Sequence, residues 1–287
     1  MPRSRVKPRE SNRFSHRDMP KAMDVATVTV NVPLLEEMDS LARERLELHA
    51  QLFEAAQIQR KLSGPRSVQC GRMEFASEVF AARYLSGDFA VLSQSGSKVL
   101  ATLGDIAGKG FAAGMWFTNL AGLLQSYCHP DCDPAQAATE INRHLCYLRP
   151  AAPFVTAFLA RIDCDSGKLA YCNAGHFAPI LLRADGQAEL LDVGGPLLGA
   201  VDDATFQSGD VHLRPGDMLV AYSDGVLECQ NEAGEEFGSG RLLATLQQSK
   251  QLTARNALVA LLAAVQDFAN GKPLSDDVSL TVIRRYD

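Results

Sequence analysis

Aspartates next to a glycine or a second acid recur in this sequence beside short apolar runs. They stand at Gly87-Asp88, Gly104-Asp105, Asp224-Gly225 and Asp276-Asp277. The apolar run 218–222 precedes Asp224, and the run 278–282 follows Asp277. Because such runs are typical of buried strands, each acid is expected at a strand end, where its backbone is held in place. A neighbouring glycine leaves space for backbone carbonyls and water.

Converging carboxylates repel one another unless a divalent cation lies between them. Sites with only oxygen ligands suit Mg²⁺ or Mn²⁺. Two such ions about 3.5 to 4 Å apart can share a hydroxide and direct it in line at phosphorus. A single Asp-Gly after a strand is most often a turn, and Asp210 and Asp217 are interpreted in that way. The acidic positions therefore predict a two-metal phosphate hydrolase if they meet in the fold.

Short motifs surround these acids in a fixed order along the chain. They are 57–62 (QIQRKL), 86–89 (SGDF), 104–110 (GDIAGKG), 154–158 (FVTAF), 173–176 (NAGH), 196–199 (PLLG), 215–217 (PGD), 222–226 (YSDGV) with Glu228, and 275–279 (SDDVS). From about Gln57 to the C-terminus the chain resembles the SpoIIE/RsbU-like branch of the PPM (type 2C) metal-dependent serine/threonine protein phosphatases. Ser86 and Ala107 depart from the glycine and serine usual in that family, which affects loop geometry and metal affinity.

The resemblance implies a PPM-type β-sandwich flanked by helices (αββα), with two Mn²⁺ or Mg²⁺ ions at one end. The implied reaction is hydrolysis of phosphoserine or phosphothreonine by a metal-bridging hydroxide, without a phosphoenzyme. Carried over by position, the catalytic residues are Asp88, Asp105, Asp224 and Asp276. The implied metal ligands are these four, the carbonyl of Ile106, and Asp277 as an alternative ligand or a group beside the ligands.

Recognition of the substrate phosphate remains unassigned. Lys109 is a candidate for electrostatic help, although a basic residue in a glycine-rich turn is more often solvated. His176 is a candidate proton donor to the leaving group, and a structural histidine is the favoured alternative.

A heptad pattern precedes the motifs. Leucine or alanine recurs every seven residues at positions 34, 41, 48, 55 and 62, and Ser63-Gly64-Pro65 follows. The pattern predicts an amphipathic helix over 34–62, which either pairs with a second copy in a homodimer or packs on its own core. The predicted division is a disordered basic leader (1–33), a linker or switch helix (34–64) and a phosphatase domain (65–287). We hypothesise that the helix acts on the turn from Asp105 to Gly110.

Beyond Val68 the sequence alternates between short β-rich runs and a few helical patterns. Hairpin turns are indicated at 165–167 and 184–186. We expect strands at 72–79, 88–94, 98–105, 154–163, 168–174, 178–183, 208–213, 217–223 and 277–284, and helices at 110–127, 134–148, 239–248 and 253–268. Helices inserted between groups of antiparallel strands predict an α+β fold with the helices outside.

Charge and cysteine content bound the function. Residues 1–22 hold seven basic and two acidic residues, and the remainder holds 21 basic and 32 acidic residues. The acidic body argues against nucleic acid as the main ligand, and the leader is interpreted as solvated. Seven cysteines without a CxxC pair indicate reduced thiols and a cytoplasmic protein. No run approaches the roughly 18 to 20 apolar residues of a membrane span.

The favoured function is a phosphatase that acts on a phosphorylated STAS-domain anti-sigma-factor antagonist in bacterial signalling, a partner that the resemblance implies. The alternative is a catalytically degenerate phosphatase fold that binds or dimerises. A two-metal nuclease is a third reading, which the acidic body disfavours.

Overall fold

The structure is a computed structural model that describes residues 32–129 and 131–286. The chain divides into two units, residues 1–46 and 47–287. The predicted disordered leader falls mostly on residues 1–31, which lie outside the described residues. The predicted domain boundaries after residues 33 and 64 stay predictions.

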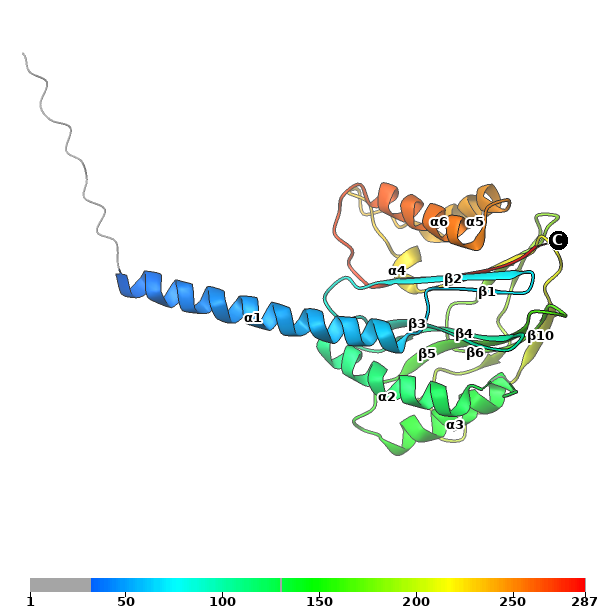
Figure 1. Cartoon of the computed structure of the whole chain (residues 1–287), viewed down its shortest axis with the longest axis horizontal. Helices are drawn as coiled ribbons and strands as arrows, with labels where there is room; N and C mark the ends of the chain where they lie inside the picture. Colours follow the sequence, from blue (N-terminus) through cyan, green and yellow to red (C-terminus); the bar gives the residue numbers. More distant parts are fainter. Residues whose placement is uncertain (1–31, 130, 287) are drawn as a thin grey trace, which may run out of the picture. The chain divides into compact units, whose positions relative to one another are not determined.

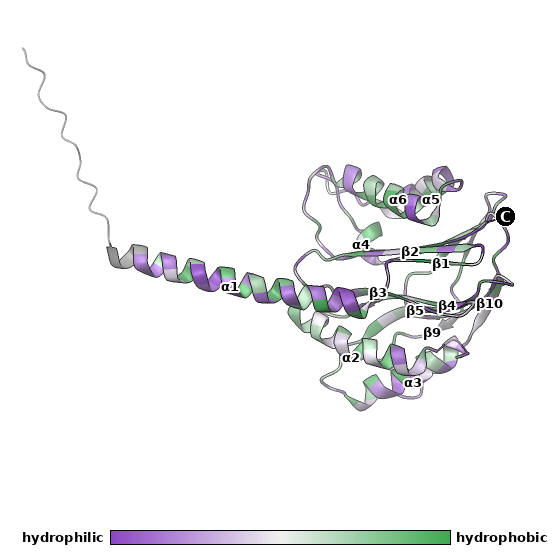
Figure 2. Ribbon diagram, viewed as in Figure 1, coloured by the Kyte–Doolittle hydropathy of each residue, from purple (hydrophilic) through white to green (hydrophobic). Residues whose placement is uncertain are grey.

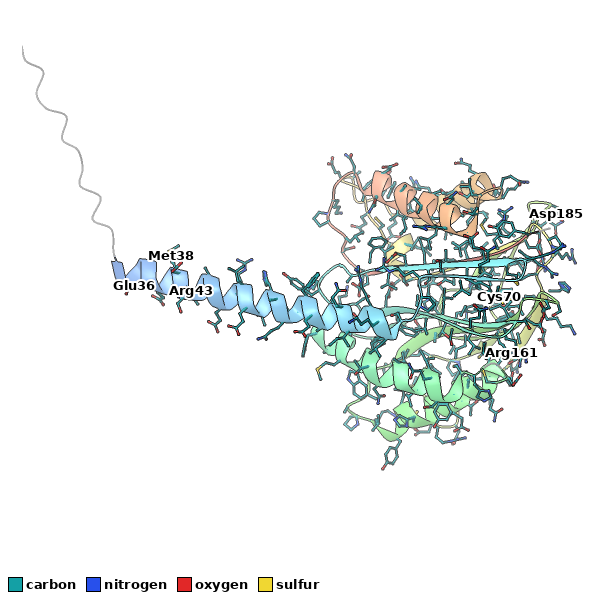
Figure 3. The ribbon with its side chains drawn as sticks, viewed as in Figure 1. Glu36, Met38, Arg43, Cys70, Arg161 and Asp185 are labelled. Carbon is teal, nitrogen blue, oxygen red and sulfur yellow. The ribbon has the colours of Figure 1, made fainter. Side chains whose placement is uncertain are left out.

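Helix α1 (Val32–Leu62) contains the predicted heptad segment. It ends where Ser63-Gly64-Pro65 was expected to stop it, and Gly64 adopts a positive φ of 78°. Apolar and polar residues alternate along it (Figure 2). The heptad positions 34, 41, 48, 55 and 62 form one seam along this helix. Leu41 and Leu48 of the seam are each more than half exposed, as is Met38, which Figure 3 labels.

Two sheets of mostly antiparallel strands form the second unit. The first sheet has the order β1 (Ser67–Cys70), β2 (Met73–Phe80), β12 (Val278–Arg285), β11 (Met218–Tyr222), β7 (Ile180–Leu182) and β8 (Ala188–Leu190). The second has the order β10 (Gly209–His212), β6 (Lys168–Ala174), β5 (Val155–Asp163), β4 (Lys98–Ile106) and β3 (Asp88–Ser95). The short β9 (Gly194–Gly195) pairs in parallel with β6.

Helices cover the outer face of each sheet (Figure 1). Those on the second sheet are α2 (Phe111–Tyr127) and α3 (Pro134–Tyr147), and those on the first are α5 (Gly238–Ser249) and α6 (Ala254–Ala269). The one-turn α4 (Asp224–Leu227) follows β11. Local signals fix the helix ends: the Asp133 carboxylate caps α3, the Thr253 hydroxyl caps α6, and α6 stops at Asn270 in the left-handed conformation.

Strand β4 shows how the layers are held together. Val99, Ala101 and Leu103 point into the core between the sheets, whereas Leu100 and Ile106 pack toward the helices. Because successive side chains of a strand face opposite sides, a strand buried on both faces is apolar throughout.

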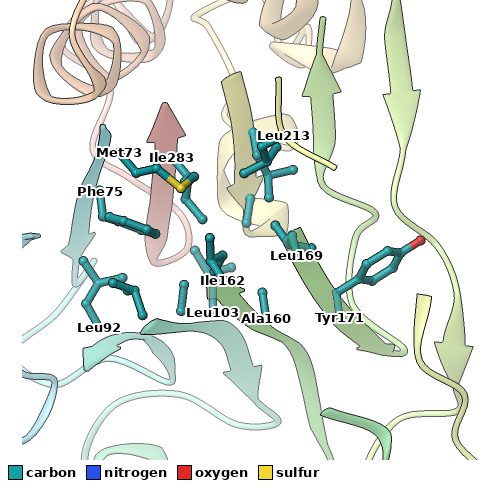
Figure 4. Close-up of a cluster of buried hydrophobic side chains, with 14 of the residues drawn as sticks. Met73, Phe75, Leu92, Leu103, Ala160, Ile162, Leu169, Tyr171, Leu213 and Ile283 are labelled. Carbon is teal, nitrogen blue, oxygen red and sulfur yellow. The ribbon is translucent and has the colours of Figure 1, made fainter. Parts of the chain in front are cut away.

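The core between the sheets draws on both of them. In Figure 4, Leu103 and Ile162 of the second sheet lie near Ile283 of the first, and all three are at most 2% exposed. Burying side chains of this size is the largest favourable contribution to folding. This core fixes the two sheets against each other and therefore the side chains at their common edges.

The predicted α+β sandwich with flanking helices is confirmed. Every expected strand and helix is present within about two residues of its predicted ends. The prediction missed β1, β8, β9 and α4, which are at most four residues long. Asp217 is a turn residue, as interpreted, and pairs with Arg183 at 2.8 Å. Asp210 lies in β10 rather than in a turn. No helix among the described residues has the length and apolarity needed to cross a membrane.

Candidate active site

Asp88 and Asp105 are brought together by the pairing of β3 with β4. Asp88 is the first residue of β3, and it is the register partner of Asp105 near the end of β4. On its other side Asp105 lies opposite Thr156 of β5. The two carboxylates therefore stand side by side at one edge of the second sheet.

The other predicted acids come from the first sheet. Asp224 follows β11 after one residue, and Asp276-Asp277 directly precede β12. Since β11 and β12 are antiparallel neighbours, the end of one and the start of the other share an edge. The charges of Asp224, Asp276 and Asp277 all act on Asp105, so the edges of the two sheets coincide at this point.

Burial and the neighbouring negative charges raise the pKa values of Asp105 and Asp224. Burial, followed by the charges of Asp224 and Asp276, raises the pKa of Asp105 to about 6. Burial, followed by the charge of Asp276, also raises the pKa of Asp224. Such shifts mean that the surrounding protein does not neutralise the negative charge of the ionised carboxylates.

Asp88 is the most deeply buried of the acids, at 3% exposure. Burial raises its pKa well above the usual range; the Ser223 hydroxyl partly offsets this, and the Asp105 charge adds to it. Its Oδ2 atom has no hydrogen-bond partner among the described residues. A buried carboxylate oxygen without a partner is costly, and a bound cation would satisfy it.

Gly87 lies against a group of oxygen atoms beside Asp88. A β-carbon at this position would lie 2.9 Å from the Ile106 carbonyl oxygen, 3.1 Å from Asp105 Oδ1 and 3.2 Å from the Gly108 carbonyl oxygen. These are the hard donors that Mg²⁺ and Mn²⁺ prefer. Among residues 32–129 and 131–286, however, no three acidic, histidine or cysteine side chains are arranged to hold a metal ion. The donor chemistry fits the implied ions, although the side chains do not form a closed cluster.

Asp276 is engaged by a lysine. Lys109 Nζ lies 2.5 Å from Asp276 Oδ2, and the other Asp276 oxygen accepts the Asp277 N–H at 3.0 Å. The ammonium group thus stands where it offsets the negative charge of the acids. In this structure the positive charge of Lys109 interacts with Asp276. A metal ion bound by Asp276 would compete with Lys109 for that carboxylate.

Asp277 holds the loop that leads into Asp88. Its Oδ2 atom accepts hydrogen bonds from Ser86 Oγ and the Gly87 N–H, both at 2.8 Å, and its Oδ1 atom accepts the Ala82 N–H at 2.7 Å. Three hydrogen bonds occupy this carboxylate. Asp277 was expected either to bind a metal directly or to stand beside the ligands. The three hydrogen bonds favour the second role, in which Asp277 holds the loop that positions Asp88.

Gln59 of α1 contacts the same loop, a role that motif reasoning missed. Gln59 Nε2 donates to the Ser86 carbonyl at 2.7 Å, and the Ser86 N–H donates to Gln59 Oε1 at 3.2 Å. The side-chain amide thus bonds both backbone polar groups of Ser86, the residue two positions before Asp88. The signal in the sequence was the place of Gln59 in the motif 57–62, which does not by itself indicate a contact with Ser86.

His176 is buried with both ring nitrogens occupied. Nδ1 accepts from the Thr156 hydroxyl at 2.9 Å, and Nε2 donates to the Tyr222 carbonyl at 3.1 Å. Burial lowers its pKa to about 4, so the ring is neutral near pH 7. His176 ties the strand opposite Asp105 to the strand before Asp224, which is the structural role favoured from the sequence.

Two packed sheets with outer helices, and aspartates from both sheets at one edge, define the class of PPM-type phosphatases. The family model described as Stage II sporulation protein E (SpoIIE) matches residues 95–286. The chain belongs to this family, and it is a SpoIIE-type serine phosphatase.

Individual relatives agree with this assignment. The chain is 28% identical over 254 residues to the phosphoserine phosphatase RsbU of Bacillus subtilis, covering 87% of this chain and 74% of RsbU. The fold is similar to the SiaA-PP2C domain of Pseudomonas aeruginosa, with a TM-score of 0.73 and 20% identity over 86% of this chain and all of that one. It is also similar to RsbX in complex with magnesium, with a TM-score of 0.59 and 13% identity over 76% of this chain and 98% of that one.

Proposed function

We propose that this chain hydrolyses phosphoserine or phosphothreonine on a protein partner with the help of two Mn²⁺ or Mg²⁺ ions. The observation that carries the proposal is the pairing of Asp88 with Asp105, where a buried carboxylate oxygen has no hydrogen-bond partner within residues 32–129 and 131–286. The raised pKa values of Asp105 and Asp224 add to it, because the cluster is electrostatically incomplete. Magnesium in the structure of RsbX supports the choice of ions.

The residues that would hold the ions are Asp88, Asp105, Asp224, Asp276 and the carbonyl of Ile106. When bound, the ions would supply an activated water and neutralise charge on the phosphate. The protein positions the acids: strand pairing fixes Asp105, and Asp277 holds the loop before Asp88. Lys109 Nζ, released from Asp276 by an ion, would be free to face the substrate phosphate.

The partner that we propose is a phosphorylated STAS-domain protein, the anti-sigma-factor antagonist implied by the family resemblance. The likeness to RsbU, a phosphoserine phosphatase, supports a phosphorylated protein as the substrate. Hydrolysis of such a protein, with no hydrolysis of nucleotides under the same conditions, would support this assignment. Hydrolysis of nucleotides alone would contradict it.

We further propose that α1 is a switch that also forms a homodimer. Its exposed seam residues Leu41 and Leu48 offer apolar surface to a second copy. Through Gln59, α1 contacts Ser86 in the loop before Asp88. The next residue of that loop, Gly87, accepts the Ile106 N–H through its carbonyl at 3.2 Å. The expected influence on the turn from Asp105 to Gly110 is thus indirect, through Gly87.

A catalytically degenerate binding module remains the second candidate. Two observations favour it: no three side chains among the described residues are arranged for a metal, and Lys109 occupies Asp276. Manganese-dependent hydrolysis of p-nitrophenyl phosphate separates the two. We expect the wild type to turn over this ester and Asp105→Asn to lose at least about a hundredfold in kcat while it stays folded. Equal rates with Mn²⁺ and with EDTA would identify the degenerate module.

A further inference from the structure

Exposed phenylalanines gather around the catalytic acids. Among the described residues beyond α1, the phenylalanines with the greatest exposure are Phe80, Phe111, Phe154 and Phe177, at 36 to 57%. Other phenylalanines, such as Phe75, Phe89 and Phe158, are at most 2% exposed. Single exposed apolar residues need no explanation, but several exposed phenylalanines beside one group of acids do.

Two of these phenylalanines border the loop that carries Asp105. The loop in question is the one that follows Asp105 and the end of β4. The Phe154 carbonyl accepts the N–H of Ala107, the second residue after Asp105, at 2.8 Å. Phe111 is the first residue of α2, directly after the loop. Met115, one turn further along α2, is 58% exposed and lies on the same side of the helix as Phe111.

The other two border the acids of the first sheet. Phe80 ends β2 and is the register partner of Val278, the residue after Asp277. Phe177 follows the buried His176, and its ring lies 6.3 Å from the ring of Tyr222, two residues before Asp224. Phe80, Phe154 and Phe177 therefore each contact a residue two positions from an acid of the site. Phe111 begins the helix that follows the loop after Asp105.

We propose that Phe80, Phe111, Phe154, Phe177 and Met115 form a docking surface for apolar side chains that flank the phosphoserine of a protein substrate. The inference rests on the proposed function and names the kind of substrate that it acts on. The surface borders the acids, so the molecule that covers it is the one whose phosphate enters the site. Aromatic residues and methionine are enriched in such recognition surfaces.

Charge argues for a protein rather than a lipid surface as the occupant. Residues 23–287 hold 32 acidic and 21 basic side chains, and the edge itself carries five aspartates, Lys109 being paired with Asp276. An anionic membrane would be repelled by this edge. A phosphoserine flanked by leucine, valine or phenylalanine would present a single dianion to the ions that the acids would hold, and apolar area to the surrounding rings.

If the acids act on the phosphate and the phenylalanines on the flanking side chains, kcat/KM should depend on the size of the substrate. The ions that the acids would hold would act on the phosphoryl group of any ester, whereas the phenylalanines would contact only substrate atoms on either side of it. Binding energy from such remote contacts raises kcat/KM for the large substrate and is unused by a small one. Discrimination between phosphoproteins then depends on the apolar surface.

Two phosphoserine peptides test the proposal, identical except that leucine or glutamine flanks the phosphoserine on both sides. With Mn²⁺ present, the wild type should hydrolyse the leucine peptide with a kcat/KM about tenfold above that of the glutamine peptide, because buried leucine area adds affinity. In Phe111→Ser and in Phe177→Ser this ratio should fall toward one. p-Nitrophenyl phosphate, measured for each variant, serves as the internal reference for the acids. Val259→Ser, at an equally exposed apolar position on α6, is the matched control and should keep the wild-type ratio.

The outcomes separate this inference from the function beneath it. Equal kcat/KM for both peptides in the wild type would contradict the docking surface, and so would an unchanged ratio in both phenylalanine variants. Neither result would contradict the proposed phosphatase activity. The same loss of ratio in Val259→Ser also overturns the docking surface. No metal-dependent turnover of p-nitrophenyl phosphate by the wild type overturns the phosphatase proposal and the docking surface with it. Melting curves of all variants confirm that the comparison is made between folded proteins.

Discussion

The side-chain amide of Gln59 holds both polar groups of the Ser86 backbone, and Ser86 stands two residues before the buried Asp88. The same Ser86 donates its hydroxyl to Asp277 at 2.8 Å. A helix outside the sandwich is thereby linked through one loop to acids from both sheets. The position of that loop decides where the Asp88 carboxylate lies.

Gln59→Ala should weaken metal binding more than it weakens the fold. Two hydrogen bonds to the loop are lost, each worth about 1 kcal/mol, so the loop loses its fixed position before Asp88. We expect the Mn²⁺ concentration for half-maximal hydrolysis of p-nitrophenyl phosphate to rise about five- to tenfold. Gln51→Ala, on the same helix at an exposed position, is the control and should leave it unchanged. An unaltered metal dependence in Gln59→Ala would show that the link is only structural.

Asp105 should make the metal-free protein less stable as the pH rises. Its pKa is about 6 in the folded chain, against 3.8 for the isolated group, so the folded state binds the proton more tightly than the unfolded one. Its favourable contribution is complete below about pH 4 and is lost between about pH 4 and pH 6. Asp105→Asn removes this titration. In EDTA, the free energy of unfolding of the wild type minus that of the variant should therefore fall over this range and stay level above it.

Urea unfolding at several pH values measures this difference directly. Other groups titrate in both proteins, so only the difference reports on Asp105. A difference that is constant from pH 4 to pH 7 would mean that the folded protein does not raise this pKa.

His176→Ala should destabilise the protein without a specific effect on proton transfer. The variant leaves the Thr156 hydroxyl and the Tyr222 carbonyl without their buried partner, at a cost of roughly 2 to 3 kcal/mol. Phenyl phosphate needs a proton on its leaving group more than p-nitrophenyl phosphate does. We expect the ratio of kcat for the two esters to match that of the wild type. A selective loss on phenyl phosphate would instead identify His176 as the proton donor.

Leu41→Lys combined with Leu48→Lys should convert a homodimer into monomers. Both leucines are more than half exposed and lie on the predicted seam, so two charges there would repel across a paired helix. Sedimentation velocity measures the change. Leu46→Lys is the matched control, because Leu46 is 69% exposed but lies off the seam. A wild type that sediments as a monomer at high micromolar concentration would refute the dimer.

Local sequence patterns were sufficient to predict the longer helices and strands of the fold. The apolar run within 98–106 and the capped helix starting at Pro134 are encoded by neighbours in the sequence, because such runs and the helix period are properties of short segments. Each predicted acid was therefore placed correctly at a strand end. The shortest strands, such as Gly194–Gly195, were missed because two residues carry no period and depend on their partner strand.

The contacts of the site belong to the tertiary structure alone. Nothing local to Lys109 indicates that it reaches Asp276, 167 positions along the chain, or that Asp277 holds the loop before Asp88. The sequence by itself determined which carboxylates are available and that each ends a strand. Only the packing of two sheets decided that they share one edge and that one carboxylate oxygen is buried without a partner in the described part of the chain, because strand pairing and burial depend on residues far apart in the chain.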